Sequence, residues 1–283
     1  MLEILEHTII DTLKILPFLF ITYIVMELIE HHAGEKTERA IKKSGKFGPV
    51  IGALLGIVPQ CGFSAIAANF YAARIITRGT LIAIFLSTSD EMLPILISEG
   101  APLGVILEIL IIKVIIGIVV GVVIDLLQRK NNITNKSNHE EIHKICEHEH
   151  CNCEEEGILK SSIKHTIQIF AYIFIISFAI NIIIHTVGEN TIAGFIVNIP
   201  FIGPIIASLV GIIPNCASSI ILTQLYLENI ITMGSMIAGL LANSGVGILV
   251  LFKANKNYKE NFQILGILYV VAIISGISLD LLI

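Results

Sequence analysis

Two short motifs that join a proline, an amide and a thiol are the first candidates for chemistry in this sequence. They consist of Pro59, Gln60 and Cys61 in one place and of Pro214, Asn215 and Cys216 in the other. A thiolate suits soft and borderline metals, and a proline that interrupts a helix leaves backbone carbonyls free as oxygen ligands. We therefore expect a metal or metalloid to bind where the two motifs meet. Free cysteines also serve as small buried packing residues, and this interpretation stays open.

A run of hydroxyl and carboxyl side chains is the second candidate, and it lies inside an apolar stretch that predicts one helix over residues 79–97. It reads Ser87, Thr88, Ser89, Asp90 and Glu91. A charge at membrane depth costs roughly 3 kcal/mol, so the two carboxylates are candidates for binding a cation or carrying a coupled proton. The neighbouring hydroxyls would add neutral oxygen ligands.

Two further features relate to this acidic run. A similar polar stretch later in the chain contains Asn243 and Ser244, which offer neutral oxygen ligands in place of charge. Lys113 lies in the middle of another apolar run, and we expect it to be the charge partner of Asp90. An ion pair with a structural role alone is the alternative to a transport role for Asp90.

A tract of His, Cys and Glu between residues 138 and 156 has the composition of a metal-binding segment. Its candidate ligands are His143, Cys146, His148, His150, Cys151 and Cys153. Cys151 and Cys153 are too close for the C-x2-C spacing of zinc knuckles, so we expect an adaptable chelating loop. A solvated acidic linker is the alternative.

The elements that position these residues are predicted to be membrane-spanning helices. The sequence is 54% apolar and only 14% charged, with a mean hydropathy of +0.85, which excludes an ordinary soluble domain. Several apolar runs approach the roughly 20 residues that a helix needs to cross a bilayer, namely residues 9–29, 104–127, 167–184 and 264–283. No basic stripe suited to a phosphate backbone is present. We therefore expect a lipid bilayer and no nucleic acid as partner.

An internal repeat organises the chain. Residues 48–96 align without gaps onto residues 203–251, at an offset of 155, and 20 of the 49 positions are identical. The same offset places Asp125 on Asp280, and we expect both to be interfacial helix ends. The sequence divides into repeat 1 (residues 1–130), a cytoplasmic metal-binding loop (131–160) and repeat 2 (161–283).

Each motif tip is flanked by apolar segments of about 11 to 15 residues, which as helix reach only about 17 to 22 Å. We expect each tip to join two half-helices in a re-entrant hairpin, with two short complete crossings as the alternative. Three full transmembrane helices beside each hairpin give an odd number of crossings, so repeat 2 would be inverted.

Loops rich in Lys and Arg alternate with loops that have none, which predicts a cytoplasmic central loop and extracytoplasmic termini. The predicted fold is an all-α multi-pass membrane protein with two inverted repeats and about ten helical segments. Inverted repeats with broken helices are typical of secondary transporters whose substrate site lies at the midplane.

The two Pro-(Gln/Asn)-Cys tips, the Ser-Thr-Ser-Asp-Glu-Met-Leu-Pro segment and the His/Cys-rich loop together resemble the ten-helix heavy-metal exporter family. Members of that family are also described as arsenic-efflux proteins or manganese transporters. The resemblance covers nearly the whole chain apart from the central loop. It implies export of a toxic metal or metalloid, with the tips and the acidic run along the substrate path.

We expect a secondary transporter in the cell membrane that exports a heavy or transition metal ion, with a manganese-like divalent cation favoured. The sequence contains no phosphate-binding loop, so an ion gradient or the membrane potential would drive transport, and protons are the candidate coupling ion. No cofactor is expected beyond a transported or loop-bound metal. An arsenite or organoarsenical permease with paired thiolates is the alternative.

Two other classes of protein are less consistent with the sequence. An intramembrane enzyme would place a base beside its nucleophile, but no intramembrane histidine adjoins either motif cysteine, so we expect no enzyme. A metal-responsive scaffold would place all activity in the central loop.

Overall fold

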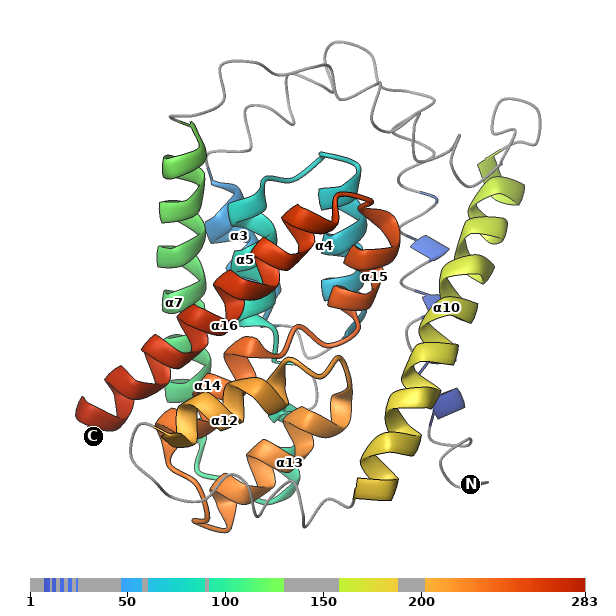
Figure 1. Ribbon diagram of the computed structural model, residues 1–283. Coiled ribbons are helices and arrows are strands. Elements are labelled where there is room, and N and C mark those ends of the chain that lie inside the picture. The colour runs from blue at the N-terminus through green and yellow to red at the C-terminus, as the bar shows by residue number, and fades with distance from the viewer. Residues whose placement is uncertain are drawn as a thin grey trace.

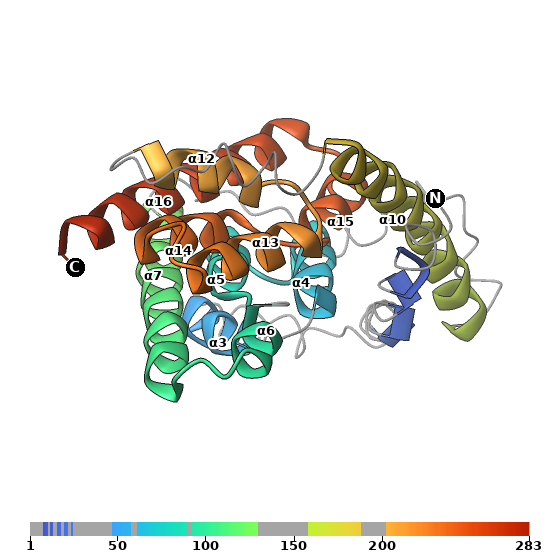
Figure 2. The ribbon, with the colours of Figure 1, turned by 90° about the horizontal axis from the view of Figure 1, so that it is seen from below.

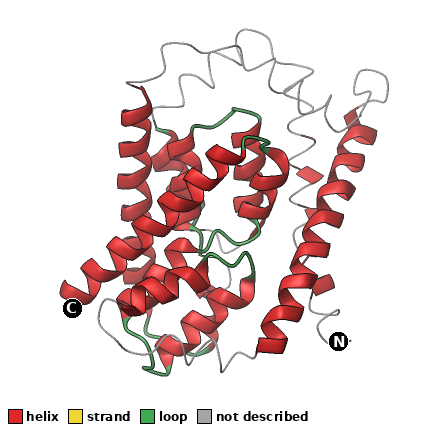
Figure 3. Cartoon of the chain, viewed as in Figure 1, coloured by secondary structure: helices red, strands yellow, loops and turns green. Residues whose placement is uncertain are grey.

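The computed structural model describes residues 8–10, 12–13, 16–17, 20–21 and 24 near the start of the chain, and then residues 47–57, 61–89, 92–129, 158–187 and 202–282. Within these ranges every regular element is a helix and none is a strand (Figure 3). Four stretches of the described chain are long and apolar enough to cross a membrane, namely Arg78–Ser98, Leu103–Gln128, Met233–Ala254 and Tyr258–Leu282. The protein is therefore all-α and multi-pass, as the sequence predicted.

The helices of the first half are α3 (Gly48–Leu55), α4 (Cys61–Ala72), α5 (Arg78–Ser87), α6 (Met92–Ser98) and α7 (Leu103–Arg129). The helices of the second half are α10 (Ile158–Val187), α12 (Ile202–Gly211), α13 (Cys216–Leu227), α14 (Met233–Ala242), α15 (Gly247–Ala254) and α16 (Tyr258–Leu282). The pairs α4 and α13, α5 and α14, α6 and α15, and α7 and α16 each begin 155 residues apart, which is the offset of the sequence repeat. In Figure 1 α7 runs upward and α16 runs downward, so these two equivalent helices have opposite directions.

The helices on either side of each proline tip are short. α3 and α4 have 8 and 12 residues, and α12 and α13 have 10 and 12. At 1.5 Å per residue, each is shorter than the roughly 30 Å of a hydrocarbon core. Their lengths agree with the half-helices that the sequence predicted.

Two of the four spans are interrupted midway. α5 ends at Ser87, and Thr88 and Ser89, here called the first break, are not helical. In the second half α14 ends at Ala242, and residues 243–246, the second break, separate it from α15. The sequence predicted an uninterrupted helix over residues 79–97, and the structure differs because short polar side chains compete for backbone groups at these points.

The interrupted spans form the centre of the bundle. In the apolar windows of Met233–Ala254 and Arg78–Ser98, 94% and 75% of the residues are buried, against 33% in Leu103–Gln128 and 22% in Tyr258–Leu282. α7 packs on α5 and α16 packs on α14, so each long helix covers one interrupted span. Leu107, Ile111, Ile115 and Val119 of α7 recur every four residues and are more than half exposed, as on a lipid-facing stripe.

The two halves also exchange helices. α4 of the first half packs on α15 of the second, and α13 of the second packs on α6 of the first, while α5 contacts α14 between them. α10 packs on α15 and stands at the edge of the bundle far from α7, as both Figure 1 and Figure 2 show. The two halves therefore share one core, to which α4, α5 and α6 of the first half and α13, α14 and α15 of the second contribute.

The described links between helices differ in charge at the two ends of the bundle. At the upper end in Figure 1 the α4–α5 and α15–α16 links contain or adjoin the basic residues Arg74, Arg78, Lys253, Lys256 and Lys259. At the lower end the α6–α7 and α13–α14 links contain Glu99 and Glu228 and no Lys or Arg.

A carboxylate near the end of each long helix anchors the start of each interrupted span. Asp125 of α7 accepts hydrogen bonds from the Thr77 hydroxyl at 2.6 Å and from the Gly79 N–H at 2.8 Å. Asp280 of α16 accepts the equivalent bonds from Thr232 at 2.9 Å and from the Gly234 N–H at 3.0 Å. Both aspartates thus fix helix N-termini, where negative charge is favourable, in addition to standing near helix ends.

Candidate functional site at the helix breaks

The chain that enters the first proline tip lies against the first break. The Ser89 hydroxyl donates a hydrogen bond of 2.6 Å to the Ile57 carbonyl, two residues before Pro59. Gly56 stands so close to α5 that a Cβ there would fall 2.0 Å from the Ser87 hydroxyl oxygen. Only a glycine permits this approach, which brings the chain entering the tip to the interrupted span.

The helix that leaves the first tip lies against the second break. A Cβ on Gly247, the first residue of α15, would fall 2.7 Å from the Cβ of Ser64 in α4 and 2.9 Å from the ring of Phe85 in α5. The first turns of α4 and α15 and the last turn of α5 therefore touch. The described segments on either side of the first tip therefore lie against the two breaks.

Lys113 connects the two breaks directly. It lies in the middle of α7, is 1% exposed, and donates hydrogen bonds to the Thr88 carbonyl and, at 3.3 Å, to the Leu240 carbonyl. Thr88 belongs to the first break, and Leu240 belongs to the last turn of α14, just before the second. A single ammonium group therefore reaches backbone oxygens from both halves.

The second break is held in shape by its own residues. The Asn243 side-chain oxygen accepts a hydrogen bond of 2.8 Å from the Gly245 N–H, and Gly245 has a φ of +53°. Asn243 and Ser244 are 3% and 4% exposed. The two predicted oxygen ligands of the second break, Asn243 and Ser244, are thus buried, although Asn243 already uses its side-chain oxygen within the turn.

The second proline tip is a tight turn into α13. Asn215 is buried, its N–H donates to the Ile213 carbonyl at 2.7 Å, and its own carbonyl accepts from the Ser218 hydroxyl at 2.7 Å. Pro214 is half-buried beside it. Cys216 is the first residue of α13, as Cys61 is of α4.

Several predicted site residues lie outside the described part of the structure. They are Pro59, Gln60, Asp90 and Glu91, and the whole loop with His143, Cys146, His148, His150, Cys151 and Cys153. The side chains of Cys61 and Cys216 are not described either, so the meeting of the two thiols and the Asp90–Lys113 ion pair stay predictions. Within the described ranges, no three His, Cys, Asp or Glu side chains gather as a metal site would require.

Helix ends set the electrostatics around the two breaks. α5 and α14 end there, and helix C-termini carry partial negative charge, whereas α4 and α13 begin with the cysteines at partially positive N-termini. Ser87, Thr88 and Ser89 are all buried, and the hydroxyls of Ser87 and Thr88 bond back to carbonyls of α5. Backbone carbonyls at the two helix C-termini can therefore coordinate a cation, and a thiolate can be accommodated at either helix start.

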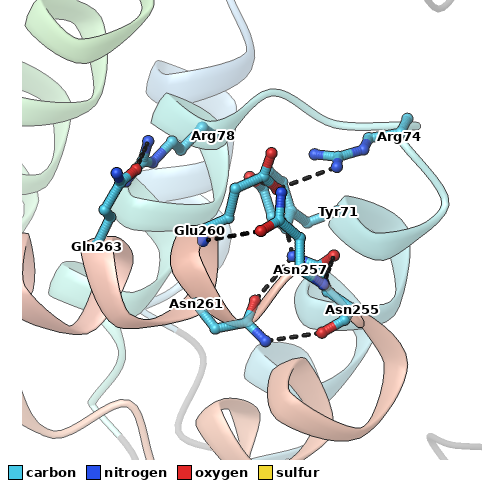
Figure 4. Close-up of polar contacts among 8 residues, drawn as sticks. All are labelled: Tyr71, Arg74, Arg78, Asn255, Asn257, Glu260, Asn261 and Gln263. Atoms are coloured by element: carbon cyan, nitrogen blue, oxygen red, sulfur yellow. Dashed lines mark hydrogen bonds and ion pairs between the residues drawn. The ribbon is translucent and has the colours of Figure 1, made fainter.

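A polar junction links the two halves at the basic end of the bundle (Figure 4). Arg74 forms an ion pair of 3.0 Å with Glu260, and the Tyr71 hydroxyl donates to the same carboxylate at 3.3 Å. Asn255 and Asn261 continue the network, with 2.8 Å between their side chains. The equivalent of Arg74 in the second half is Asn229, which shares its positive φ but not its charge.

Sequence reasoning did not identify the backbone carbonyls of Ile57, Thr88 and Leu240 as part of the site. A carbonyl carries no signature in the sequence, and these three come together only through contacts between distant segments. Gly56 could have been recognised, because the repeat has a glycine at the equivalent position 211.

The chain matches a family described as "Putative, 10TM heavy-metal exporter" over residues 2–199 and again over residues 155–282. No curated protein and no solved structure matched the chain significantly.

Proposed function

The chain belongs to this family of heavy-metal exporters, whose members are transporters and not enzymes, and we propose that it exports a manganese-like divalent cation through a site between the two helix breaks. The metal would bind to backbone carbonyls at the C-termini of α5 and α14, with Asp90 as the anionic ligand next to the first break. The residues proposed along the path are Gln60, Cys61, Ser87, Thr88, Ser89, Asp90, Glu91, Asn215, Cys216, Asn243 and Ser244.

The observation that carries this proposal is the pair of hydrogen bonds made by Lys113. They place carbonyl oxygens of both halves within reach of one cationic atom at mid-helix depth. Helix C-termini that meet at an interruption are a recurring way to coordinate cations inside secondary transporters. A hard divalent ion prefers such oxygen ligands.

The proposed orientation places the basic end of the bundle in the cytoplasm. Basic links at one end and acidic links at the other agree with the positive-inside rule. Repeat 2 would then be inverted relative to repeat 1, the central loop cytoplasmic and both termini extracytoplasmic. The halves would alternate access to the site, driven by an ion gradient with protons as the candidate coupling ion.

The position of both cysteines at helix starts favours a second candidate, efflux of trivalent arsenicals. A helix N-terminus stabilises a thiolate, and two thiolates would be the central ligands of a soft metalloid. In that case the acidic residues would be secondary.

The test is elemental mass spectrometry of metal-challenged cells that express wild type, Cys61→Ser with Cys216→Ser, or Asp90→Asn. We expect the wild type to lower cellular manganese and Asp90→Asn to restore it, with the cysteine variant only weakened. The control is Glu108→Gln, which removes an exposed carboxylate on α7 and should behave as wild type. Loss of arsenic efflux in the cysteine variant alone would favour the second candidate, and unchanged content of every element would refute both.

The central loop is proposed to concentrate or sense cytosolic metal. Deletion of residues 138–156 should raise the metal concentration needed for half-maximal efflux without abolishing it. Complete loss of efflux at normal protein levels would instead support the scaffold interpretation.

A further inference from the structure

Lys113 occupies the place where the transported cation would bind. Its Nζ donates to the Thr88 carbonyl, just after α5 ends, and to the Leu240 carbonyl in the last turn of α14. The carbonyls of a last helical turn have no partner further along their own helix. They also form the negative end of the helix dipole. The site therefore contains a positive charge of its own when no metal is bound.

The position is asymmetric between the two halves. The residue equivalent to Lys113 in α16 is Leu268, which is fully buried and uncharged. The first half alone supplies this charge in the pair of long helices, although the carbonyls that it reaches come from both halves. Lys113 can consequently make both hydrogen bonds only when the two halves have this arrangement.

Resting on the proposed function, we propose that the Lys113 ammonium is a resident cation that the transported metal displaces and that reoccupies the carbonyls after release. Without the ammonium group, the metal-free protein would hold two partly negative helix ends close together inside a low-dielectric core. Their repulsion would oppose the arrangement in which the C-termini of α5 and α14 lie side by side. The metal neutralises these ends on the outward step. Lys113 neutralises them on the return step, which has no metal.

A separation of two transport modes follows. Net efflux requires the empty protein to return, whereas exchange of metal for metal lets the protein move loaded in both directions. Removal of the ammonium charge should therefore suppress net efflux and spare exchange. It should also tighten metal binding, because no internal cation competes for the carbonyls.

The experiment uses the full chain, purified and reconstituted in liposomes loaded with radioactive Mn²⁺. Net efflux is measured into a medium without metal, and exchange into a medium with equal unlabelled Mn²⁺. Lys113→Gln keeps a hydrogen-bond donor but removes the charge, Lys113→Arg keeps the charge, and Leu268→Met changes the equivalent buried position without altering charge.

We expect Lys113→Gln to lose net efflux at least tenfold while it retains exchange within about twofold of wild type. Lys113→Arg and Leu268→Met should retain both modes. In detergent, Mn²⁺ should raise the melting temperature of Lys113→Gln at a lower concentration than it does for wild type. This binding measurement also applies to Lys113→Met, which serves as the neutral variant if Lys113→Gln does not fold.

An equal loss of net efflux and exchange in monodisperse Lys113→Gln would overturn the inference, because Lys113 would then be needed for the structure of the transporter and not for the return step alone. Unchanged net efflux would overturn it as well, as would unchanged or weaker Mn²⁺ binding. Absence of both fluxes in the wild type would instead refute the proposed function and the inference with it, so the two failures are distinguishable.

Discussion

Replacement of Asp125 by alanine should destabilise the protein more than the same change at Asp280. Asp125→Ala removes the acceptor of two hydrogen bonds, from the Thr77 hydroxyl at 2.6 Å and the Gly79 N–H at 2.8 Å. Hydrogen bonds to a charged group contribute about 1.5 to 3 kcal/mol each and are not fully additive, so we expect a loss of about 2 to 4 kcal/mol for the pair. The bonds to Asp280 are longer, at 2.9 and 3.0 Å, and the one from Thr232 is exposed, so about 1 to 2 kcal/mol is expected there.

The hydroxyl network gives this prediction a second part. Thr77 donates to Asp125 and accepts from the Thr80 N–H at 3.1 Å, so the Thr80 hydroxyl must be the donor in its 2.7 Å contact with Thr77. Thr77→Val removes the donor to the carboxylate and the N-cap acceptor together. Its effect should therefore combine less than additively with that of Asp125→Ala, with a coupling of about 1 to 2 kcal/mol.

The assay is heating of detergent-purified variants, followed by size-exclusion chromatography of the protein that stays monodisperse. The chain has no tryptophan, so intrinsic tryptophan fluorescence is no reporter. At about 3 °C per kcal/mol, Asp125→Ala should lower the apparent Tm by about 6 to 12 °C and Asp280→Ala by about 3 to 6 °C. Glu108→Ala, an exposed carboxylate on the same helix, is the control. Equal shifts for the two aspartates, or a shift of Asp125→Ala no larger than the control, would refute the reasoning.

Two further predictions use the same protein preparation. Gly79→Ala would place a Cβ 2.2 Å from a carbonyl oxygen of α7, whereas Gly104→Ala meets nothing within 4 Å; the first should lower the apparent Tm and the second should leave it unchanged or raise it, and a common direction of shift would contradict the packing argument. Arg74→Asn keeps the positive φ of 57° that asparagine tolerates but removes the ion pair with Glu260. Because that pair is about one-third exposed and worth at most about 1 kcal/mol, we expect little change in Tm. Loss of this link between the two halves should nevertheless speed the labelling of Cys61 by an impermeant thiol reagent in inside-out vesicles. The labelling is measured in a variant that retains Cys61 as its only cysteine. Unchanged labelling would show that the junction does not restrict access.

Local patterns in the sequence accounted for the class of fold and for the correspondence between helices of the two halves. The repeat alignment matched the sequence of α4 with that of α13 and the sequence of α5 with that of α14, and these helices begin at equivalent residues. Proline at the tips correctly indicated short legs. These features depend on neighbouring residues, which is why one sequence was enough to find them.

The interruptions and the partners of buried charges depend on distant residues. The run from Gly79 to Ile97 is apolar enough to read as one helix, and only the turn chemistry of Asn243 and Gly245 in the second half signals a break. Asp125 was expected only to be interfacial. Its hydrogen bonds could not be predicted, because its partners at the start of α5 lie 46 and 48 residues earlier in the chain. Likewise, the second acceptor of Lys113 comes from the other half of the chain, 127 residues away.

The exchange of helices between the halves has a consequence for assembly. α4 of the first half packs on α15 of the second, and α13 of the second packs on α6 of the first, so each half gives the other what it receives. Such reciprocity is the signature of an isologous interface, which two identical subunits form around a twofold axis. The contacts of these four helices thus resemble those between the two subunits of a homodimer. The first half synthesised alone would leave α4 without its partner α15, and the second half alone would leave α13 without its partner α6. Two halves expressed as separate chains would therefore have to associate before these helices could be buried.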